Sequence, residues 1–195
     1  MKEIPLSFNR YLYGNNNSYT FYDPLLKLNE NINININMIE LLSSILSPWI
    51  LRTTMGVDDF IREAVDTHGS SIQKGLLILD GRKMHDYDEV YDEFSRVMSF
   101  PDYFGRNLNA LDECLSDLEW LGLDSYIIFI KNADEVLQSE AEGGFDGLIE
   151  ILVNAAKEFS MPVNMGEAWD RGAVLFHVIL QSNKNSLKLD FVNGY

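Results

Sequence analysis

Carboxylates gather on one turn of a predicted helix near the middle of this chain. Asp112 and Glu113 are adjacent, Asn109 precedes them by about one helical turn, and Ser116 follows them by another. Such a group suits the gripping of a cationic pocket on a partner. It is equally typical of a helix face that only meets water, so the spacing alone leaves both interpretations open.

The segment before that helix adds an acid and two aromatic rings. Asp102, Tyr103 and Phe104 lie in a predicted loop over residues 99–105, which also contains Pro101. Aromatic side chains beside charged groups are common in the centre of protein interfaces. We therefore predict that the loop and the helix together form a partner-binding surface.

Enzymatic interpretations of the same residues fit less well. A hydrolase would need Asp112 and Glu113 to flank one bond, but adjacent helical residues point about 100° apart. His68, His85, His177 and Cys114 show no metal-ligand spacing, and a histidine in an alternating strand, such as His177, is more often packed than ligating. No serine-hydrolase, phosphate-loop or dinucleotide-binding motif occurs. The sequence predicts no enzyme activity, no metal and no cofactor.

The charge of the chain narrows the class of partner. Its 30 acidic and 15 basic residues give a formal net charge of −15. Nineteen of the acids but only six of the bases lie within 76–160. Nucleic acid and anionic membranes would be repelled, whereas a basic protein would be attracted and steered. Acidity that serves only solubility is the alternative.

Length and composition indicate one folded domain with an extension. The chain has 195 residues, 46% of them hydrophobic, which is enough for a substantial core. It has no apolar run of about 18 residues and no signal-like N-terminus. Its single cysteine, Cys114, cannot form an internal disulfide, which fits a reducing compartment. We expect a cytoplasmic protein.

Residues 73–182 alternate between apolar strands and amphipathic helices. Apolar runs predict strands over 76–79, 126–130 and 173–180, and helical periodicity predicts helices over 86–98, 107–118 and 145–159. Asn107 is the expected cap of the middle helix, and a stripe of leucines from Leu108 to Leu118 is its expected buried face. The order β-α-α-β-α-β predicts an α/β fold with a small parallel sheet.

Residues 1–72 differ in pattern and are predicted to form an N-terminal α+β extension. Aromatic alternation on either side of Asn15–Asn17 predicts a hairpin. Residues 31–37 read NINININ, which fits either a strand or an asparagine-rich linker. Short helices are predicted over 38–46 and 58–65, and 183–195 is predicted to be a C-terminal tail.

Residues 100–115 read FPDYFGRNLNALDECL and resemble the signature of the barstar family. Fifteen of the sixteen positions fit without a gap, and the resemblance extends more weakly over 76–180, including VLFHVIL. It implies a three-stranded parallel sheet packed with helices. It also implies inhibition of a ribonuclease by a plug in its active site, where carboxylates take the place of substrate phosphates.

The resemblance carries over to this chain one residue at a time. Tyr103 stands where the family has an interface tyrosine, and Asn109 stands where it has an interface aspartate. Asp112 occupies the place of a tryptophan, and Glu113 that of the central aspartate that enters the phosphate pocket. Asn154 aligns with an interface glutamate. Because several of these types differ, we expect a target other than the best-known nuclease of this kind.

The resulting hypothesis is an immunity protein that binds a basic nuclease toxin through one surface. Its predicted residues come from the loop, the helix and a later helix: Asp102, Tyr103, Phe104, Asn109, Asp112, Glu113, Ser116 and Asn154. The alternative is a non-inhibitory interaction module or regulator on the same fold. The two differ in one observable feature, because an inhibitor needs the acidic helix exposed whereas a scaffold could bury it.

Overall fold

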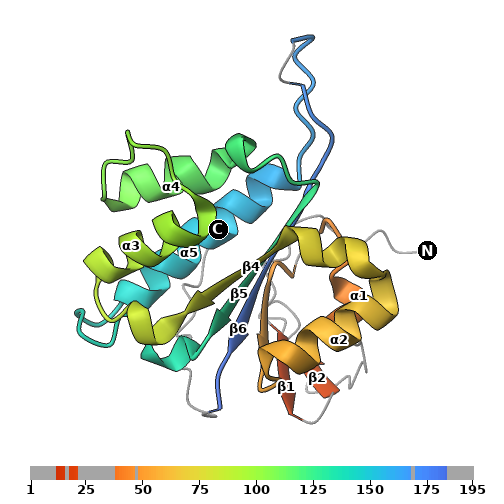
Figure 1. Ribbon diagram of the computed structural model, residues 1–195, viewed down its shortest axis with the longest axis horizontal. Helices are drawn as coiled ribbons and strands as arrows, with labels where there is room; N and C mark the ends of the chain where they lie inside the picture. The colour runs from red at the N-terminus through yellow and green to blue at the C-terminus, as the bar shows by residue number, and fades with distance from the viewer. Residues whose placement is uncertain (1–11, 16–17, 22–37, 47, 168–169, 184–195) are drawn as a thin grey trace, which may run out of the picture.

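The computed structural model of the chain describes residues 12–15, 18–21, 38–46, 48–167 and 170–183. Figure 1 shows a central sheet with one group of helices on one face and a second, smaller group on the other. Within the described residues, no helix combines the length and the apolarity that a membrane crossing requires.

The sheet has six strands in the order β2-β1-β3-β6-β5-β4. Their bounds are β1 Leu12–Asn15, β2 Ser18–Phe21, β3 Ile50–Thr53, β4 Leu76–Asp80, β5 Ser125–Lys131 and β6 Leu175–Gln181. Strands β3, β6, β5 and β4 pair in parallel, and β1 and β2 form an antiparallel pair beyond β3. The predicted α/β class with a parallel sheet and helices is therefore confirmed. The predicted count of three strands is wrong, because β3 adds a fourth parallel strand and the hairpin continues the sheet.

Strand β3 is an element that the sequence pattern did not predict. It is only four residues long, and it begins two residues after Pro48. Its pairing is entirely non-local, since Ile50 lies opposite Val178 and Leu51 opposite Ile179. A short strand of this kind gains its stability from the neighbouring strand and from burial on both faces, not from local propensity.

Helices cover both faces of the sheet. The long ones are α2 Val57–His68, α3 Tyr87–Met98, α4 Leu108–Asp117 and α5 Gly144–Phe159, and α1 Met38–Leu41 is a single turn. Helices α3, α4 and α5 share the larger apolar core with one face of the sheet, and α1 and α2 share the smaller core with the other. Alternate residues of β5 enter the two cores, so this strand is buried on both sides, as its continuous apolar run predicts.

Side-chain caps mark the starts of α3 and α4. The Asp86 side chain caps α3 by accepting from the Glu89 N–H at 2.9 Å. The Asn107 side chain caps α4 by accepting from the Ala110 N–H at 3.0 Å, as predicted. These caps fix where α3 and α4 begin, and thereby the length of the loop between them.

The N-terminal predictions have mixed outcomes. The hairpin is present as β1 and β2, although its turn at 16–17 lies outside the described residues. The helix predicted over 38–46 begins at Met38 but ends at Leu41, with turns beyond. The helix predicted over 58–65 is longer and spans Val57–His68. The stretch 31–37 and the tail from residue 184 lie outside the described residues.

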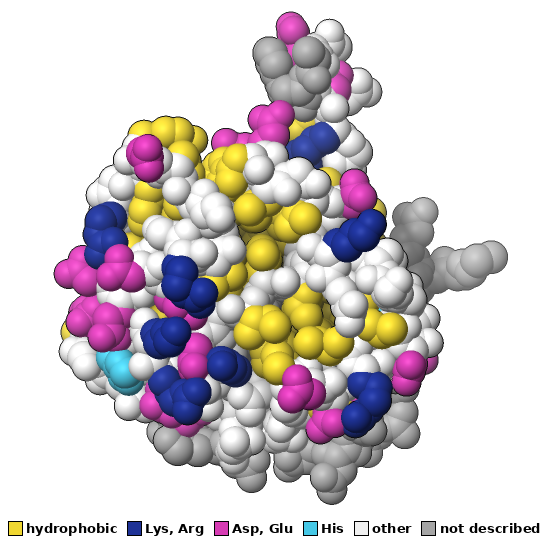
Figure 2. Space-filling view, viewed as in Figure 1, with side chains coloured by type: hydrophobic (Ala, Val, Ile, Leu, Met, Phe, Trp, Pro, Cys, Tyr) yellow, Lys and Arg dark blue, Asp and Glu magenta, His cyan; other side chains and the backbone are white. Residues whose placement is uncertain are grey.

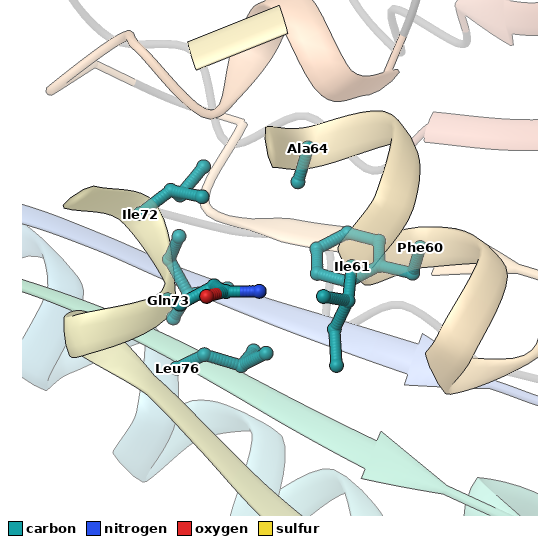
Figure 3. A pocket seen from close by; sticks show the side chains of 7 residues that line it. Phe60, Ile61, Ala64, Ile72, Gln73 and Leu76 are labelled. Carbon is teal, nitrogen blue, oxygen red and sulfur yellow. The ribbon is translucent and has the colours of Figure 1, made fainter. Parts of the chain in front are cut away.

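An apolar depression lies on the α2 face of the sheet, far from the predicted surface in the fold. Figure 3 shows Phe60, Ile61 and Ala64 of α2 on one side of it, and Ile72 and Leu76 on the other. No ionisable side chain lines it. The predicted partner-binding residues instead lie on the α4 side of the sheet.

Candidate functional site

The loop between α3 and α4 is built by a few local contacts. The Phe104 N–H donates to the Pro101 carbonyl at 2.9 Å, and the Asn107 side-chain amide donates to the Gly105 carbonyl at 3.1 Å. Arg106 adopts a left-handed backbone with φ of 48°, which turns the chain into α4. The FPDYFGRN segment therefore forms an ordered turn at the N-terminal end of α4.

The one cation of this loop points away from α4. The Arg106 guanidinium hydrogen bonds to the Asp92 carboxylate of α3 and lies 3.5 Å from the Asp88 carboxylate. It also donates to the Asp88 carbonyl at 3.3 Å. Arg106 therefore ties the loop to α3 and forms no ion pair with the acids of α4 among the described residues.

The three predicted loop residues have different environments. Asp102 is exposed, and 76% of Tyr103 is accessible to solvent. The Phe104 ring packs inward, with its centroid 4.9 Å from that of Phe100 and 5.9 Å from that of Tyr91. Phe104 therefore supports the loop from beneath, while Tyr103 is presented to solvent as a large aromatic side chain.

Helix α4 separates a buried face from a polar face. Leu111, Leu115 and Leu118 are fully buried, as the predicted stripe requires, and Leu108 is partly buried. The polar face holds Asn109 and Glu113, which are exposed, and Asp112 and Ser116, which are partly buried. All four predicted α4 residues thus lie outside the core.

Helix α5 supplies the second half of the site. It packs along α4, and Glu150, Asn154 and Glu158 lie on its exposed side at intervals of four residues. Glu150 and Glu158 were not predicted, although the four-residue spacing was visible in the sequence. Together, Asp112, Glu113, Glu150, Asn154 and Glu158 are called the acidic surface below.

Asp112 occupies the least favourable position on the acidic surface. Burial raises the pKa of its carboxyl group, and the negative charges of Glu158, Glu113 and Glu150 raise that pKa further. Its Oδ1 atom is buried and has no hydrogen-bond partner among the described residues. An ionised carboxylate in this position is destabilised until a cation or a donor approaches it.

The acidic surface is not neutralised from within the described chain. Arg82, Lys131, Arg96 and Arg106 pair with acids of β4 and α3, and none of the ion pairs among the described residues involves Asp112 or Glu113. The surface therefore keeps a concentrated negative charge that a cationic partner could neutralise.

The remaining candidate groups have structural positions. Cys114 is buried on α4, and burial raises the pKa of its thiol, as expected of a packing residue. The His177 ring is fully buried, and its Nε2 lies 2.8 Å from the Ser44 carbonyl oxygen. The prediction that His177 is packed and hydrogen bonded is therefore confirmed. In the part of the chain that the structure describes, no group of three His, Cys, Asp or Glu side chains is arranged to hold a metal ion.

Comparison with known proteins bears on the same region of the chain. The model of the family described as "Barstar (barnase inhibitor)" matches residues 75–181, which contain α3, α4, α5 and the strands β4, β5 and β6. The protein named "Putative ribonuclease inhibitor YrdF" of Bacillus subtilis (strain 168) is 33% identical over 85 residues, which cover 42% of this chain and 86% of that protein. Both descriptions are of inhibitors, in agreement with the prediction that this chain is not an enzyme. This family match covers more than half of the residues of the chain. The chain therefore belongs to the barstar family.

Proposed function

We propose that this chain is an immunity protein that inhibits a basic ribonuclease toxin in the cytoplasm. The acidic surface and the Tyr103 loop bind the active site of the toxin and exclude its RNA substrate. The observation that carries the proposal is the uncompensated carboxylate of Asp112, which is subject to the negative charges of Glu158, Glu113 and Glu150 and has no ion pair among the described residues.

The chemistry of a ribonuclease active site is complementary to this arrangement. Such a site binds phosphates with arginine, lysine and histidine side chains, and a set of carboxylates can occupy the same donors. A guanidinium that approaches α4 and α5 would provide Asp112 with a counter-ion, and Glu113 extends farther into solvent beside it. The proposed contact residues are Asp102, Tyr103, Asn109, Asp112, Glu113, Ser116 and Asn154, together with Glu150 and Glu158. Phe104 is proposed to take part through the support that its inward-packed ring gives to the loop.

The exposure of α4 favours inhibition over a scaffold role. A scaffold could bury the acidic helix in its own fold, but Asn109 and Glu113 are exposed and the loop presents Tyr103 to solvent. Clustered unpaired charge reduces the stability of a folded chain, so its retention on one surface indicates a role in binding.

An RNA-cleavage assay tests the proposal directly. Barnase and any nuclease whose gene lies beside that of this chain would each be titrated with the parent protein, with Glu113→Ala and with Asp66→Ala. Asp66 is an exposed acid of α2, so its removal changes net charge equally but lies on the opposite face of the sheet. We expect the parent and Asp66→Ala to inhibit one of the nucleases, and Glu113→Ala to bind it more weakly by about 2 kcal/mol or more.

Two results would contradict the proposal. One is failure of the parent to inhibit either nuclease, and the other is equal inhibition by the parent and Glu113→Ala. The association rate supplies a further check, because electrostatic steering predicts that it falls as salt is added.

A further inference from the structure

A long connection joins α5 to β6 and projects from the body of the molecule (Figure 1). This arm comprises residues 160–174, of which 168–169 lie outside the described residues. The Val174 N–H donates to the Phe159 carbonyl at 2.8 Å, which closes the base of the arm. Farther out, Val163 and Arg171 exchange two backbone hydrogen bonds of 2.9 and 3.1 Å. Loops of this length in a compact domain are uncommon and are usually either functional or linker segments.

Arg171 fastens the base of the arm to the end of α5. Its guanidinium lies 4.7 Å from the centre of the Phe159 ring and donates to the carbonyls of Glu158 at 3.3 Å and Met161 at 3.2 Å. These contacts use the positive charge of Arg171 at the base. The base of the arm is therefore held against the end of α5.

The outer part of the arm exposes methionine side chains. Met165 is 75% exposed and Met161 is 53% exposed. The backbone at Met165 is held by Asp170, whose carboxylate accepts from the N–H groups of Met165 and Gly166, each at 2.8 Å. Exposed methionine on an ordered support is typical of binding surfaces, because its flexible thioether adapts to different apolar partners.

The arm and the Tyr103 loop lie at opposite ends of the acidic surface. The Tyr103 loop precedes the first turn of α4, whereas the base of the arm lies by its last turn. The Tyr126 hydroxyl donates to the Leu118 carbonyl at the end of α4, and the Tyr126 ring packs against the Phe159 ring, with centroids 5.0 Å apart. Arg171 covers that same Phe159 ring and binds the Glu158 carbonyl. A partner seated on the acidic surface would therefore meet the arm at one end.

We propose that the arm is a second, apolar contact with the partner that the acidic surface binds, in which Met161 and Met165 pack against an apolar patch beside the cationic cleft. This inference rests on the proposed function. Charge complementarity identifies the occupant as a basic protein, because the methionines stand beside the exposed acid Glu167 and beside Asp170. A second copy of a chain with a net charge of −15 would be repelled, and so would an anionic membrane.

The test separates the arm from the acidic surface by kinetics. The probe is whichever of barnase and the neighbouring-gene nuclease the parent chain inhibits. The double variant Met161→Ser, Met165→Ser is compared with Leu46→Ser, which removes an equally exposed apolar side chain (57%) from the segment that follows α1. We expect the double variant to dissociate from the nuclease about tenfold faster, at an unchanged association rate and salt dependence. Leu46→Ser should match the parent.

Three results would overturn the inference. The first is a dissociation rate of the double variant equal to that of the parent, and the second is an equal loss in Leu46→Ser. The third is dimerisation of the parent, seen by analytical sedimentation, that is lost in the double variant. The arm would then bind a second copy of the chain. Glu113→Ala distinguishes the two proposals: if it weakens binding while the double methionine variant does not, the inhibitory surface stands and the arm contact fails. The urea unfolding midpoint of each variant shows whether it is folded.

Discussion

The carboxyl edge of the sheet is the group of C-terminal strand ends around Asp80. This edge and the acidic surface both contain carboxylates, but their electrostatic environments are opposite. At the edge, the Asp80 carboxylate accepts from Arg82 at 2.9 Å and from Asn132 at 2.9 Å, and Lys131 lies 3.2 Å away. Figure 2 shows Lys and Arg side chains gathered among acidic ones over this part of the molecule. On the acidic surface, the charges that act on Asp112 among the described residues are those of Glu158, Glu113 and Glu150, which are all negative.

The pKa values of the two regions move in opposite directions. Burial opposes the ionisation of Asp80, but its hydrogen bonds from Arg82, Asn132 and Lys131 outweigh that effect and hold its pKa well below the ordinary value. Glu93 behaves similarly: burial is outweighed by Arg96 and by the Asp80 N–H, and its pKa is lowered. Burial without such partners raises the pKa of Asp112 instead.

The fold thus neutralises the acids that hold its elements together and leaves Asp112 without a counter-charge among the described residues. Glu93 of α3 receives the Asp80 N–H at 3.1 Å, so the paired acids also join α3 to the edge strand β4. No similar connection uses Asp112 within the described residues.

The largest expected effect is a loss of stability when the ion pairs around Asp80 are removed. Replacement of Asp80 by alanine leaves Lys131, Arg82 and Asn132 without their common acceptor, so we expect the free energy of unfolding to fall by about 2–3 kcal/mol. Urea denaturation at neutral pH measures this loss. A loss below about 1 kcal/mol would contradict this expectation, because the ion pairs of Asp80 would then contribute little to the stability of the fold.

The second-largest effect is the pH dependence of the stability that Asp80 contributes. Because the folded-state pKa values of Asp80 and Glu93 are lowered, their contribution is complete above the unfolded-state values of about 4 and declines as pH falls through the folded values. We expect the stability difference between the parent and Asp80→Ala to narrow by about 1–2 kcal/mol between pH 7 and strong acid. A difference that stays constant with pH would show that Asp80 acts through packing and not through charge.

The smallest expected effect has the opposite sign and belongs to Asp112. Its folded-state pKa is raised, so its ionised form weakens the fold at neutral pH, and this penalty disappears below about pH 4, where the group is protonated in both states. We expect Asp112→Asn to raise the free energy of unfolding by about 0.5–1 kcal/mol at pH 7 and to have no effect in acid.

Asp112→Asn also connects stability to binding. The same variant should bind the target nuclease more weakly than the parent, because it removes the buried charge that the partner would neutralise. Glu113→Ala is the matched control, since Glu113 is exposed and its removal should change stability less. If Asp112→Asn is more stable than the parent but inhibits the nuclease equally well, the buried charge of Asp112 destabilises the fold without contributing to binding.

Local sequence patterns predicted the helices and strands of the site well. The cap at Asn107, the leucine stripe of α4 and the apolar runs of β4, β5 and β6 depend on neighbours a few residues away, and each appears in the structure. The FPDYFGRNLNALDECL segment likewise identified the family, because its fixed Pro, Gly and Asn positions specify one turn and one helix start.

Local sequence patterns could not predict the contacts between residues that lie far apart in the chain. Strand β3 depends on its pairing with β6, more than 120 residues later, and no pattern within Ile50–Thr53 reveals that partner. Glu150 and Glu158 were visible as acids at helical spacing, but their approach to Asp112 requires α5 to pack along α4. Arg106 could have paired with either helix, and the fold directs it to Asp88 and Asp92 of α3.

The amino-acid sequence by itself determined the class of this protein: an acidic α/β chain with one signature loop and helix. Its helices and strands followed because periodicity, caps and charge count are local properties of the chain. Only the tertiary structure decided which acids are neutralised and which are not. Pairing depends on distances of a few ångströms between elements far apart in sequence, and those distances are set by how the helices pack on the sheet.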